Sequence, residues 1–338
     1  MKIVITGGAG FLGVRLARTL LAQGSLALAG APAQAIQTLV LLDRAAPPAD
    51  LQADPRVQVK VGDLNELLEA KDAASPAIAS DAALIFHLAA AVSGECEADF
   101  DLGMRSNFAA THALLETCRA LKTQPVLVFA SSLAVFGLTA GQSPLQPMDD
   151  FSLPTPQTSY GIQKFIGEQM MADYTRKGFV RGRTTRLMTV SVRPGKPNGA
   201  ASSFFSGMLR EPLAGERSTV PVVASTPVAL ASPASTVRGL IRAAEASDAE
   251  WGLRTAVNLP ALQTTVGDMA AALERVTGPQ ATALLDWVPN PAIERIVATW
   301  PANVQSPRAN ALGLQADASM DDILRQYMAD NPQAVKRA

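Results

Sequence analysis

The first thirteen residues, MKIVITGGAGFLG (1–13), decide the fold of the chain. Lys2–Thr6 is a short apolar run typical of a β-strand, and Gly7, Gly10 and Gly13 follow it at G-x-x-G-x-x-G spacing. An amphipathic helix is predicted to begin inside this motif, at Phe11. A strand, a glycine-rich turn and a helix in direct succession are the context in which such a motif binds a dinucleotide. The free N–H groups of the helix N-terminus then face the pyrophosphate. The alternative, a simple turn, requires neither neighbouring element.

Apolar runs alternate with helical patterns through the first half of the chain. Strands are predicted at residues 39–42, 57–61, 82–87, 126–129 and 185–192. This alternation predicts an α/β fold of the Rossmann type, with a doubly wound parallel sheet and right-handed crossovers. We expect residues 1–192 to form an NAD-binding domain that also carries the catalytic residues. Residues 193–338 are expected to form mainly a smaller C-terminal substrate lobe, from which segments return to the Rossmann core. Pro, Gly and Ser punctuate residues 194–235, which are predicted to be irregular.

Two acidic residues follow predicted strands and are candidates for the adenosine end of the cofactor site. In an open parallel sheet, ligands bind at the carboxyl ends of the strands. Asp43 ends the second strand, where a carboxylate accepts both ribose hydroxyls and repels a 2′-phosphate, so NAD is favoured over NADP. Arg44 leaves NADP open, because it could meet a 2′-phosphate. Asp63 is predicted to bind the adenine amino group or, alternatively, to begin the next helix.

A serine, a tyrosine and a lysine form the strongest candidate for a catalytic group. Ser132 follows the strand at 126–129, and Tyr160 and Lys164 share one face of a predicted helix. A phenol with a reference pKa of about 10 is a poor base at neutral pH. An ammonium one turn away and the positive nicotinamide would stabilise the phenolate. We therefore predict that Tyr160 is the base, Lys164 its electrostatic partner, and Ser132 the residue that orients the substrate hydroxyl.

The composition excludes several classes of partner. The 338 residues include 29 basic and 30 acidic side chains, so there is no basic field for nucleic acid or for a membrane surface. No apolar run is long enough to span a bilayer, and a strand that begins at residue 2 leaves no room for a signal peptide. Cys96 and Cys118 are expected to be packed thiols, and no metal site is predicted. We expect a cytoplasmic enzyme that acts on a small molecule.

Four segments resemble a known family. TGGAGFLG (6–13), HLAA (87–90), SSLAVFG (131–137) and YGIQK (160–164) are similar to the extended short-chain dehydrogenase/reductase family, which includes nucleotide-sugar epimerases and dehydratases. The resemblance covers essentially the whole chain and implies NAD as the cofactor. It also implies that Ser132, Tyr160 and Lys164 are catalytic. One departure is Phe136, where the family often has tyrosine.

Further segments resemble one branch of this family, the NAD-dependent dehydrogenases that oxidise C2 of a four-carbon sugar acid. They are VSGECEADFDLGMRSN (92–107), RPGKPNGAASSFFSGMLREPLAG (193–215), NLPALQTTVGDMAAALERVTG (258–278) and NPAIERIV (290–297). Two alternatives stay open. A nucleotide-sugar epimerase or dehydratase would use the same triad with tightly bound NAD, although no carboxylate follows Ser132 as a dehydratase would need. A non-catalytic NAD sensor would not need Lys164.

Contacts with NAD and with a sugar acid are expected from two sets of residues. The expected cofactor residues are Gly7, Gly10, Phe11, Leu12, Gly13, Asp43, Asp63, Leu64, Leu88, Ala89, Ala90, Asn107, Tyr160, Lys164 and Pro194. A sugar acid needs a cation or a cluster of donors for its carboxylate, and a guanidinium suits it best. The expected substrate residues are Ser93, Gly94, Ser132, Tyr160, Lys196, Asn198, Ser203 and Arg210. Arg210 is the preferred anchor, whereas Arg193 is expected to support its loop.

Two predicted helices carry apolar residues on more than one face. They span residues 100–122 and 159–176. The family resemblance implies that such helices form a four-helix interface, so a homodimer is expected. Complete burial of these residues within one monomer would explain the same pattern.

Overall fold

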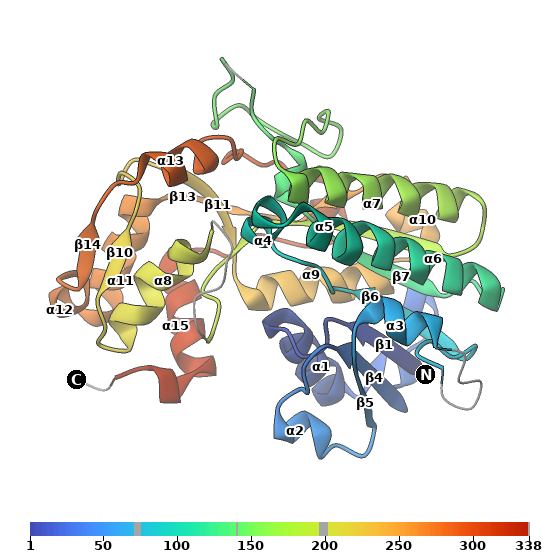
Figure 1. The fold of residues 1–338 in the computed structure, drawn as a ribbon. Helices are drawn as coiled ribbons and strands as arrows, with labels where there is room; N and C mark the ends of the chain where they lie inside the picture. The colour runs from blue at the N-terminus through green and yellow to red at the C-terminus, as the bar shows by residue number, and fades with distance from the viewer. Residues whose placement is uncertain (71–75, 140, 196–201, 337–338) are drawn as a thin grey trace.

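The molecule is built around a seven-stranded sheet in a computed structural model that describes residues 1–70, 76–139, 141–195 and 202–336 (Figure 1). The strand order is β12-β8-β7-β6-β1-β4-β5, and every neighbouring pair is parallel. This order, with the reversal between β1 and β6, is that of a Rossmann fold, and the predicted fold class is confirmed. The strands are β1 (Lys2–Thr6), β4 (Thr38–Asp43), β5 (Val57–Val61), β6 (Ala82–His87), β7 (Val126–Ser132), β8 (Arg181–Leu187) and β12 (Val257–Asn258).

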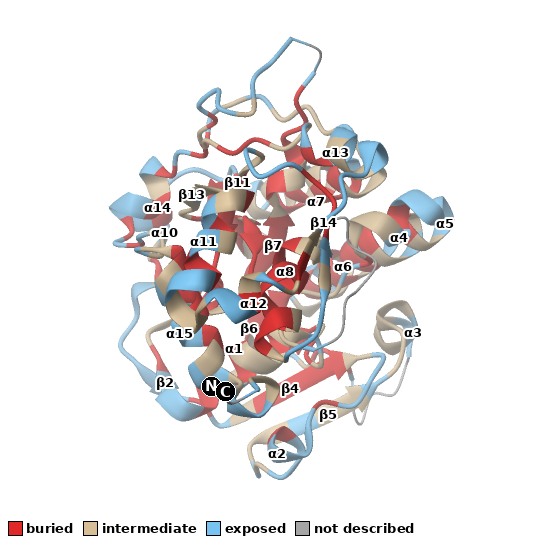
Figure 2. Cartoon of the chain, turned by 90° about the vertical axis from the view of Figure 1, so that its left-hand side faces the viewer, coloured by how far each residue is buried: buried red, intermediate tan, exposed pale blue. Residues whose placement is uncertain are grey.

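Helices cover both faces of this sheet. Alternate residues of a strand point to opposite faces, so Ile3 and Ile5 pack against α1 (Phe11–Gln23) and α9 (Pro233–Glu245). Val4 packs on the other face, in the cluster that includes α6 (Ala110–Leu121) and α7 (Ser159–Arg176). Buried residues accordingly run through the central strands in Figure 2. Shorter elements complete this part: α2 (Ala49–Gln52), α3 (Leu64–Glu69), α4 (Ser93–Ala98), α5 (Phe100–Gly103), α10 (Asp248–Trp251) and α14 (Pro307–Ala311).

A second hydrophobic core is formed by buried residues from Val192 onwards. It is enclosed by two small sheets and five helices, which lie beside the large sheet in Figure 1. The sheets are β13-β11-β9, with β9 (Thr189–Val190), β11 (Pro227–Ala231) and β13 (Leu262–Thr265), and β10-β14, with β10 (Ser218–Val220) and β14 (Leu285–Trp287). The helices are α8 (Ser203–Leu213), α11 (Val266–Thr277), α12 (Pro279–Thr282), α13 (Pro291–Val297) and α15 (Met320–Asp330). β12 is an edge strand of the large sheet, and α9 packs against that sheet. Both elements lie later in the sequence than Val192, where the second core begins. The division at residue 192 into two domains stays a prediction.

Three local expectations differ from the structure. Residues 194–235 are not irregular throughout, because α8, β10 and β11 lie there. The single helix expected at 100–122 is three segments, with the π-helical turn η2 (Met104–Ala109) between α5 and α6. The strand expected at 185–192 is divided between β8, which ends at Leu187, and β9, which belongs to another sheet. A small hairpin of β2 (Ser25–Leu26) and β3 (Gln34–Ala35) around a 3₁₀ turn, η1 (Leu28–Gly30), lies between α1 and β4. None of the described helices is long and apolar enough to cross a membrane.

Candidate active site

Two adjoining cavities lie at the carboxyl ends of the central strands. The larger has a volume of about 780 Å³ and the smaller about 360 Å³. Both are lined by Gly7 and Gly10 of the glycine-rich loop and by Leu88, Ala90 and Ala91 after β6. The shared lining lies where the strand order reverses, which is the place where a dinucleotide binds in this fold. A dinucleotide can therefore extend from one cavity into the other across the loop.

The glycines of the loop leave room that side chains would fill. Gly7 has φ +72°, and a Cβ there would lie 2.8 Å from the backbone nitrogen of Ala89. A Cβ on Gly13 would lie 2.1 Å from the carbonyl oxygen of Gly7. At Gly10 the nearest atom to a Cβ is the Gly7 oxygen, at 3.3 Å, so that position is open toward the cavity. Gly7 and Gly13 thus allow the loop to pack closely, whereas the absence of a side chain at Gly10 leaves space in the cavity. The site fits a cofactor pyrophosphate.

Substituting two of these glycines separates folding from cofactor binding. We expect Gly13→Ala to lower the free energy of unfolding by about 3 kcal/mol, because its methyl group overlaps backbone. Gly10→Ala is expected to leave that free energy nearly unchanged and to weaken NAD binding at least about tenfold, because its methyl group enters the cofactor space. Urea unfolding and fluorescence titration with NADH measure the two effects. Equal NAD affinity in Gly10→Ala and the unmodified protein would contradict this role of Gly10.

The smaller cavity brings both predicted acidic residues together. The Asp43 carboxylate accepts hydrogen bonds from the N–H groups of Ala9 (2.9 Å) and Ala45 (3.2 Å). Two of its four lone-pair positions remain for ribose hydroxyls. Asp63 caps α3 by accepting from the Asn65 N–H, so the alternative given for this residue is correct, and it also lines the cavity. Arg44, the reason for considering NADP, is paired with Asp63 at 2.8 Å.

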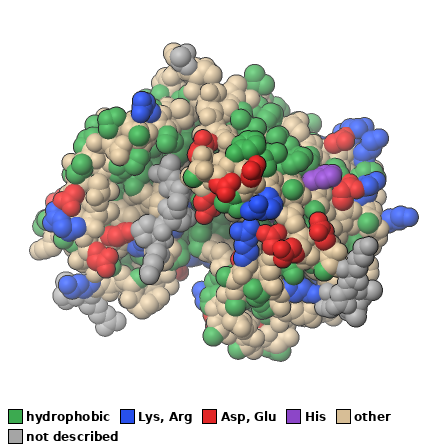
Figure 3. Space-filling model, in the orientation of Figure 1, with side chains coloured by type: hydrophobic (Ala, Val, Ile, Leu, Met, Phe, Trp, Pro, Cys, Tyr) green, Lys and Arg blue, Asp and Glu red, His purple; other side chains and the backbone are tan. Residues whose placement is uncertain are grey.

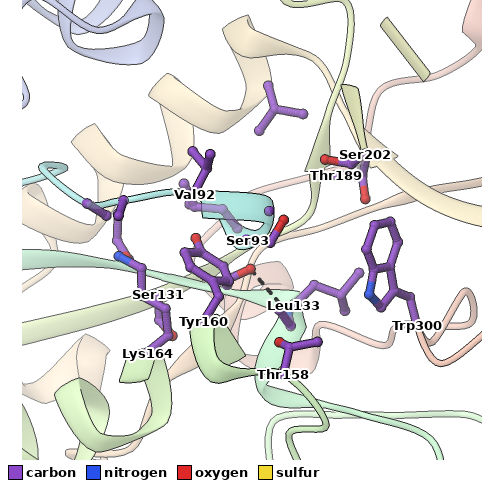
Figure 4. Close-up of a pocket in the computed structure, with 18 of the residues that line it drawn as sticks. Val92, Ser93, Ser131, Leu133, Thr158, Tyr160, Lys164, Thr189, Ser202 and Trp300 are labelled. Atoms are coloured by element: carbon purple, nitrogen blue, oxygen red, sulfur yellow. Dashed lines mark hydrogen bonds between the residues drawn. The ribbon is translucent and has the colours of Figure 1, made fainter. Parts of the chain in front are cut away.

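The larger cavity brings Ser132, Tyr160 and Lys164 together (Figure 4). The Thr158 side chain caps α7 by accepting from the Gly161 N–H at 3.1 Å, which places Tyr160 in the first turn. A Cβ on Gly161 would lie 2.2 Å from the carbonyl oxygen of Ala134, so only glycine lets α7 approach the turn that follows Ser132. Lys164 lies one turn further and donates from Nζ to the carbonyl oxygen of Ala130 at 2.9 Å. The helix start and the strand end therefore meet at the predicted catalytic group.

The structure distinguishes the two adjacent serines of β7. The Ser132 side chain lines the larger cavity with Tyr160 and acts to lower the pKa of its phenol. Ser131 instead donates to Oε1 of Glu168 at 2.6 Å, and Glu168 forms a two-pronged pair with Arg186 at 2.9 and 2.7 Å. Glu168 and Arg186 are 3% and 4% exposed, so this pair is buried directly behind the site. It joins α7 to β7 and β8 beside the catalytic serine, and the sequence analysis did not identify it.

Burial dominates the electrostatics of the catalytic group in the cofactor-free protein. It raises the pKa of Tyr160, against the effects of the Ser132 side chain and the positive charge of Arg193. Burial also lowers the pKa of Lys164 to about 8, while the negative charge of Glu168 acts in the opposite direction. A cation added beside Tyr160 would lower the pKa of its phenol.

Two polar residues near the site are structural. His87 is buried, and its ring nitrogens lie 2.7 Å from Oγ1 of Thr6 and 3.0 Å from Oγ1 of Thr111. Burial lowers the pKa of His87 to about 3, so the ring is neutral and packs as part of the core. Asn107, in the π-helical turn, accepts from the Ala91 N–H at 2.8 Å and donates to Gln163 at 2.8 Å. It holds the loop after β6 rather than lining either cavity.

Most of the other predicted site residues line one of the two cavities. Those that do are Gly7, Gly10, Phe11, Leu12, Gly13, Asp43, Asp63, Leu64, Leu88, Ala89, Ala90, Ser93 and Gly94. Ser93 is the first residue of α4. Those that line neither cavity are Asn107, Pro194, Ser203 and Arg210. Lys196 and Asn198 lie outside the described residues.

Arg210 does not occupy the position expected of a carboxylate anchor. Its guanidinium donates to the carbonyl oxygen of Arg193 at 2.9 Å and to Glu211 at 2.6 Å. Arg193, in contrast, lines the larger cavity and lies near Tyr160. Thr189, Ser202 and Trp300 line the same cavity and lie across it from Tyr160 and Lys164 in Figure 4. The only signal for Arg193 in the sequence is its position before Pro-Gly after a predicted strand. Among the described residues, no group of His, Cys, Asp and Glu side chains could hold a metal ion.

Comparison with known proteins identifies the family. The model of the NAD dependent epimerase/dehydratase family matches residues 3–252. The chain belongs to this family, as the motifs predicted, and the prediction of NAD as the cofactor is confirmed.

Individual relatives cover nearly the whole chain. The chain is 50% identical to a D-erythronate dehydrogenase of Cupriavidus necator over 98% of both chains. It is 39% identical to a D-erythronate dehydrogenase of Haemophilus influenzae, over 97% of this chain and 99% of that protein. The structure also resembles that of a nucleoside-diphosphate-sugar epimerase from Agrobacterium tumefaciens, with a TM-score of 0.87 and 37% identity, over 99% of this chain and 95% of that one.

Proposed function

We propose that this protein is an NAD-dependent dehydrogenase that oxidises the C2 hydroxyl of D-erythronate to give 2-dehydro-D-erythronate. The observation that carries the proposal is that Ser132, Tyr160 and Lys164 line the same cavity as the glycine-rich loop. The names of two relatives that span the whole chain supply the substrate. The Agrobacterium tumefaciens protein supports a second candidate, a nucleotide-sugar epimerase.

In this mechanism the protein orients the substrate and moves one proton. Ser132 holds the C2 hydroxyl against Tyr160, and Oη of Tyr160, as phenolate, takes its proton. Lys164, fixed through Nζ to the Ala130 carbonyl oxygen, contributes positive charge that favours the phenolate. NAD, when bound, supplies the acceptor for the hydride from C2. The reaction leaves a keto acid and returns Tyr160 to the neutral form, from which the proton must pass to solvent.

The residues that line the two cavities are the proposed contacts. We propose that Asp43 binds the adenosine ribose, with Asp63 and Leu64 beside the adenine, and that Lys164 also binds the nicotinamide ribose. The loop from Gly7 to Gly13 would hold the pyrophosphate, next to Leu88, Ala89 and Ala90. Ser93 and Gly94, at the start of α4, would contact the substrate together with Ser132 and Tyr160.

A direct test measures NADH formation. Purified protein is supplied with NAD and either D-erythronate, L-threonate, D-threonate or a five- or six-carbon aldonic acid, with UDP-sugars tested in parallel. We expect NADH to form with D-erythronate and much less with the other acids. If no acid yields NADH while a UDP-sugar is interconverted without net NADH, the protein is an epimerase and the dehydrogenase proposal is wrong.

We further propose a cytoplasmic homodimer that pairs through α5 and α7. Phe100 on α5 and Ile162 on α7 are 61% and 47% exposed, and hydrophobic side chains gather over these helices in Figure 3. In contrast, Leu114 and Leu115 of α6 are buried within the monomer. An exposed apolar patch of this kind favours an interface. Light scattering in solution, with a mass twice that of the chain expected, tests this assembly.

A further inference from the structure

Arg193 is held in one orientation on the wall of the larger cavity. Its Nε donates to the carbonyl oxygen of Val190 at 2.9 Å, and its Nη2 donates to Oγ of Ser202 at 2.8 Å. Its backbone N–H donates to Oγ of Ser206 at 3.0 Å. Each of these partners is neutral. These neighbours therefore fix the direction of the Arg193 side chain, but they supply no negative charge to balance its positive one.

Arg193 is half-buried, and the arginines that are more fully buried differ in this respect. Arg183 pairs with Asp248, Arg186 with Glu168, and Arg210 with Glu211. Arg193 has no ion pair with any carboxylate of the described residues. Burial lowers the pKa of Arg193, which shows that its charge is partly removed from water. A guanidinium in such a place is stabilised when an anion enters and supplies the missing partner.

The position of Arg193 suits a carboxylate next to the reacting carbon. Arg193 and Tyr160 line the same cavity, and their side chains interact electrostatically. In a 2-hydroxy acid, C1 carries the carboxylate and is bonded directly to C2, whose hydroxyl must face Tyr160. The anchor for the carboxylate must therefore lie close to the base. Arg295 of α13 also lines the cavity, but its side chain is exposed.

We propose that Arg193 binds the C1 carboxylate of the substrate and thereby directs the C2 hydroxyl toward Tyr160. This inference rests on the proposed function, because it assigns a residue to the substrate of that reaction. Ser202 holds Nη2, so the remaining guanidinium N–H groups are available to donate to the carboxylate. Arg210 does not reach the cavity. It donates a hydrogen bond to the carbonyl oxygen of Arg193, and its own charge is neutralised by Glu211. With Arg193 in this role, we expect the cavity to select acids over neutral polyols.

The cofactor pyrophosphate is a second anion that Arg193 is near enough to bind. Its guanidinium carbon lies 5.9 Å from the centre of the Phe11 ring, next to the glycine-rich loop. An arginine there could bind the cofactor pyrophosphate instead of the substrate. The two roles differ in which ligand loses affinity when the charge is removed, and this difference defines the experiment.

The experiment uses Arg193→Met and Arg193→Ala in the full-length protein, with D-erythronate and NADH as probes. For Arg193→Met we expect KM for D-erythronate to rise about 100-fold or more, while the dissociation constant for NADH, from fluorescence titration, changes less than about twofold. Guanidinium chloride at low concentration should restore part of the activity of Arg193→Ala. Thermal unfolding confirms that both variants are folded. Arg193→Lys should show an intermediate KM, because lysine keeps the positive charge but lacks the planar guanidinium that binds a carboxylate through two N–H groups.

Three results would overturn the assignment. They are an unchanged KM for D-erythronate in Arg193→Met, a weakened affinity for NADH with KM unchanged, and a larger rise of KM in Arg295→Met than in Arg193→Met. The second result would assign Arg193 to the cofactor. Failure of the proposed function gives a different signature, since the unmodified protein would then form no NADH from any sugar acid.

Discussion

We expect the replacement of Tyr160 by phenylalanine to lower kcat about 10³- to 10⁴-fold, while the affinity for NAD stays within about twofold of that of the unmodified protein. The loss is that of a positioned general base, for which factors of about 10² to 10⁴ are typical. The substitution removes one oxygen from a side chain that lines the cavity and leaves the α7 start, the glycine-rich loop and Asp43 in place. Binding is therefore expected to survive when turnover does not.

The chain offers a matched control for this substitution. Tyr174 lies on the same helix, and its hydroxyl donates to Glu116, away from both cavities. Tyr174→Phe should keep kcat within about twofold, with at most about 1 kcal/mol lost from the free energy of unfolding. Initial rates of NADH formation and NADH fluorescence titrations measure both variants. Turnover close to that of the unmodified protein in Tyr160→Phe would remove Tyr160 from the reaction.

We expect the replacement of Arg186 by methionine to lower the free energy of unfolding by about 3–5 kcal/mol. The substitution leaves the Glu168 carboxylate, which is 3% exposed, without its cation. Breaking a buried pair from one side costs this much because the remaining charge stays in a poorly solvated interior. Arg176→Met is the control, since Arg176 pairs with Asp173 at the exposed end of the same helix, where a pair contributes at most about 1 kcal/mol.

A second substitution tests the reason for that loss. In the double variant Arg186→Met with Glu168→Gln, both charges of the pair are absent, so no carboxylate is left at position 168 without its cation, and most of the lost stability should return. Urea unfolding of the single and double variants gives the comparison. If the double variant is as unstable as Arg186→Met alone, the loss arises from packing, because Arg186 also lies over the Phe136 ring at 4.6 Å, and not from the isolated carboxylate.

Local sequence was sufficient for the cofactor half of the molecule. The segment TGGAGFLG places a strand, a tight turn and a helix next to one another, and each of these depends on residues within thirteen positions. Tyr160 and Lys164 share a helix face for the same reason, since four positions make one turn. Asp43 could be placed because it ends an apolar strand. The fold class, the family and the cofactor follow from such short patterns.

Long-range contacts decided the rest of the site. Arg193 and Arg210 both belong to one continuous stretch of sequence, and a guanidinium suits a carboxylate at either position. Only the packing of α8 shows that Arg210 is paired with Glu211 and faces the backbone of Arg193, while Arg193 lines the cavity. Asn107 resembled a cofactor ligand until its partners, Ala91 and Gln163, were known.

The sequence by itself therefore determined the Rossmann sheet, the glycine-rich loop and the identity of Ser132, Tyr160 and Lys164, because their geometry is set by neighbours a few residues away. Only the tertiary structure decided which arginine lines the larger cavity and which charges are buried behind it. The Glu168–Arg186 pair joins residues 18 positions apart. Whether such a side chain is neutralised, buried or open to a ligand depends on segments that folding brings together, and no local pattern records that.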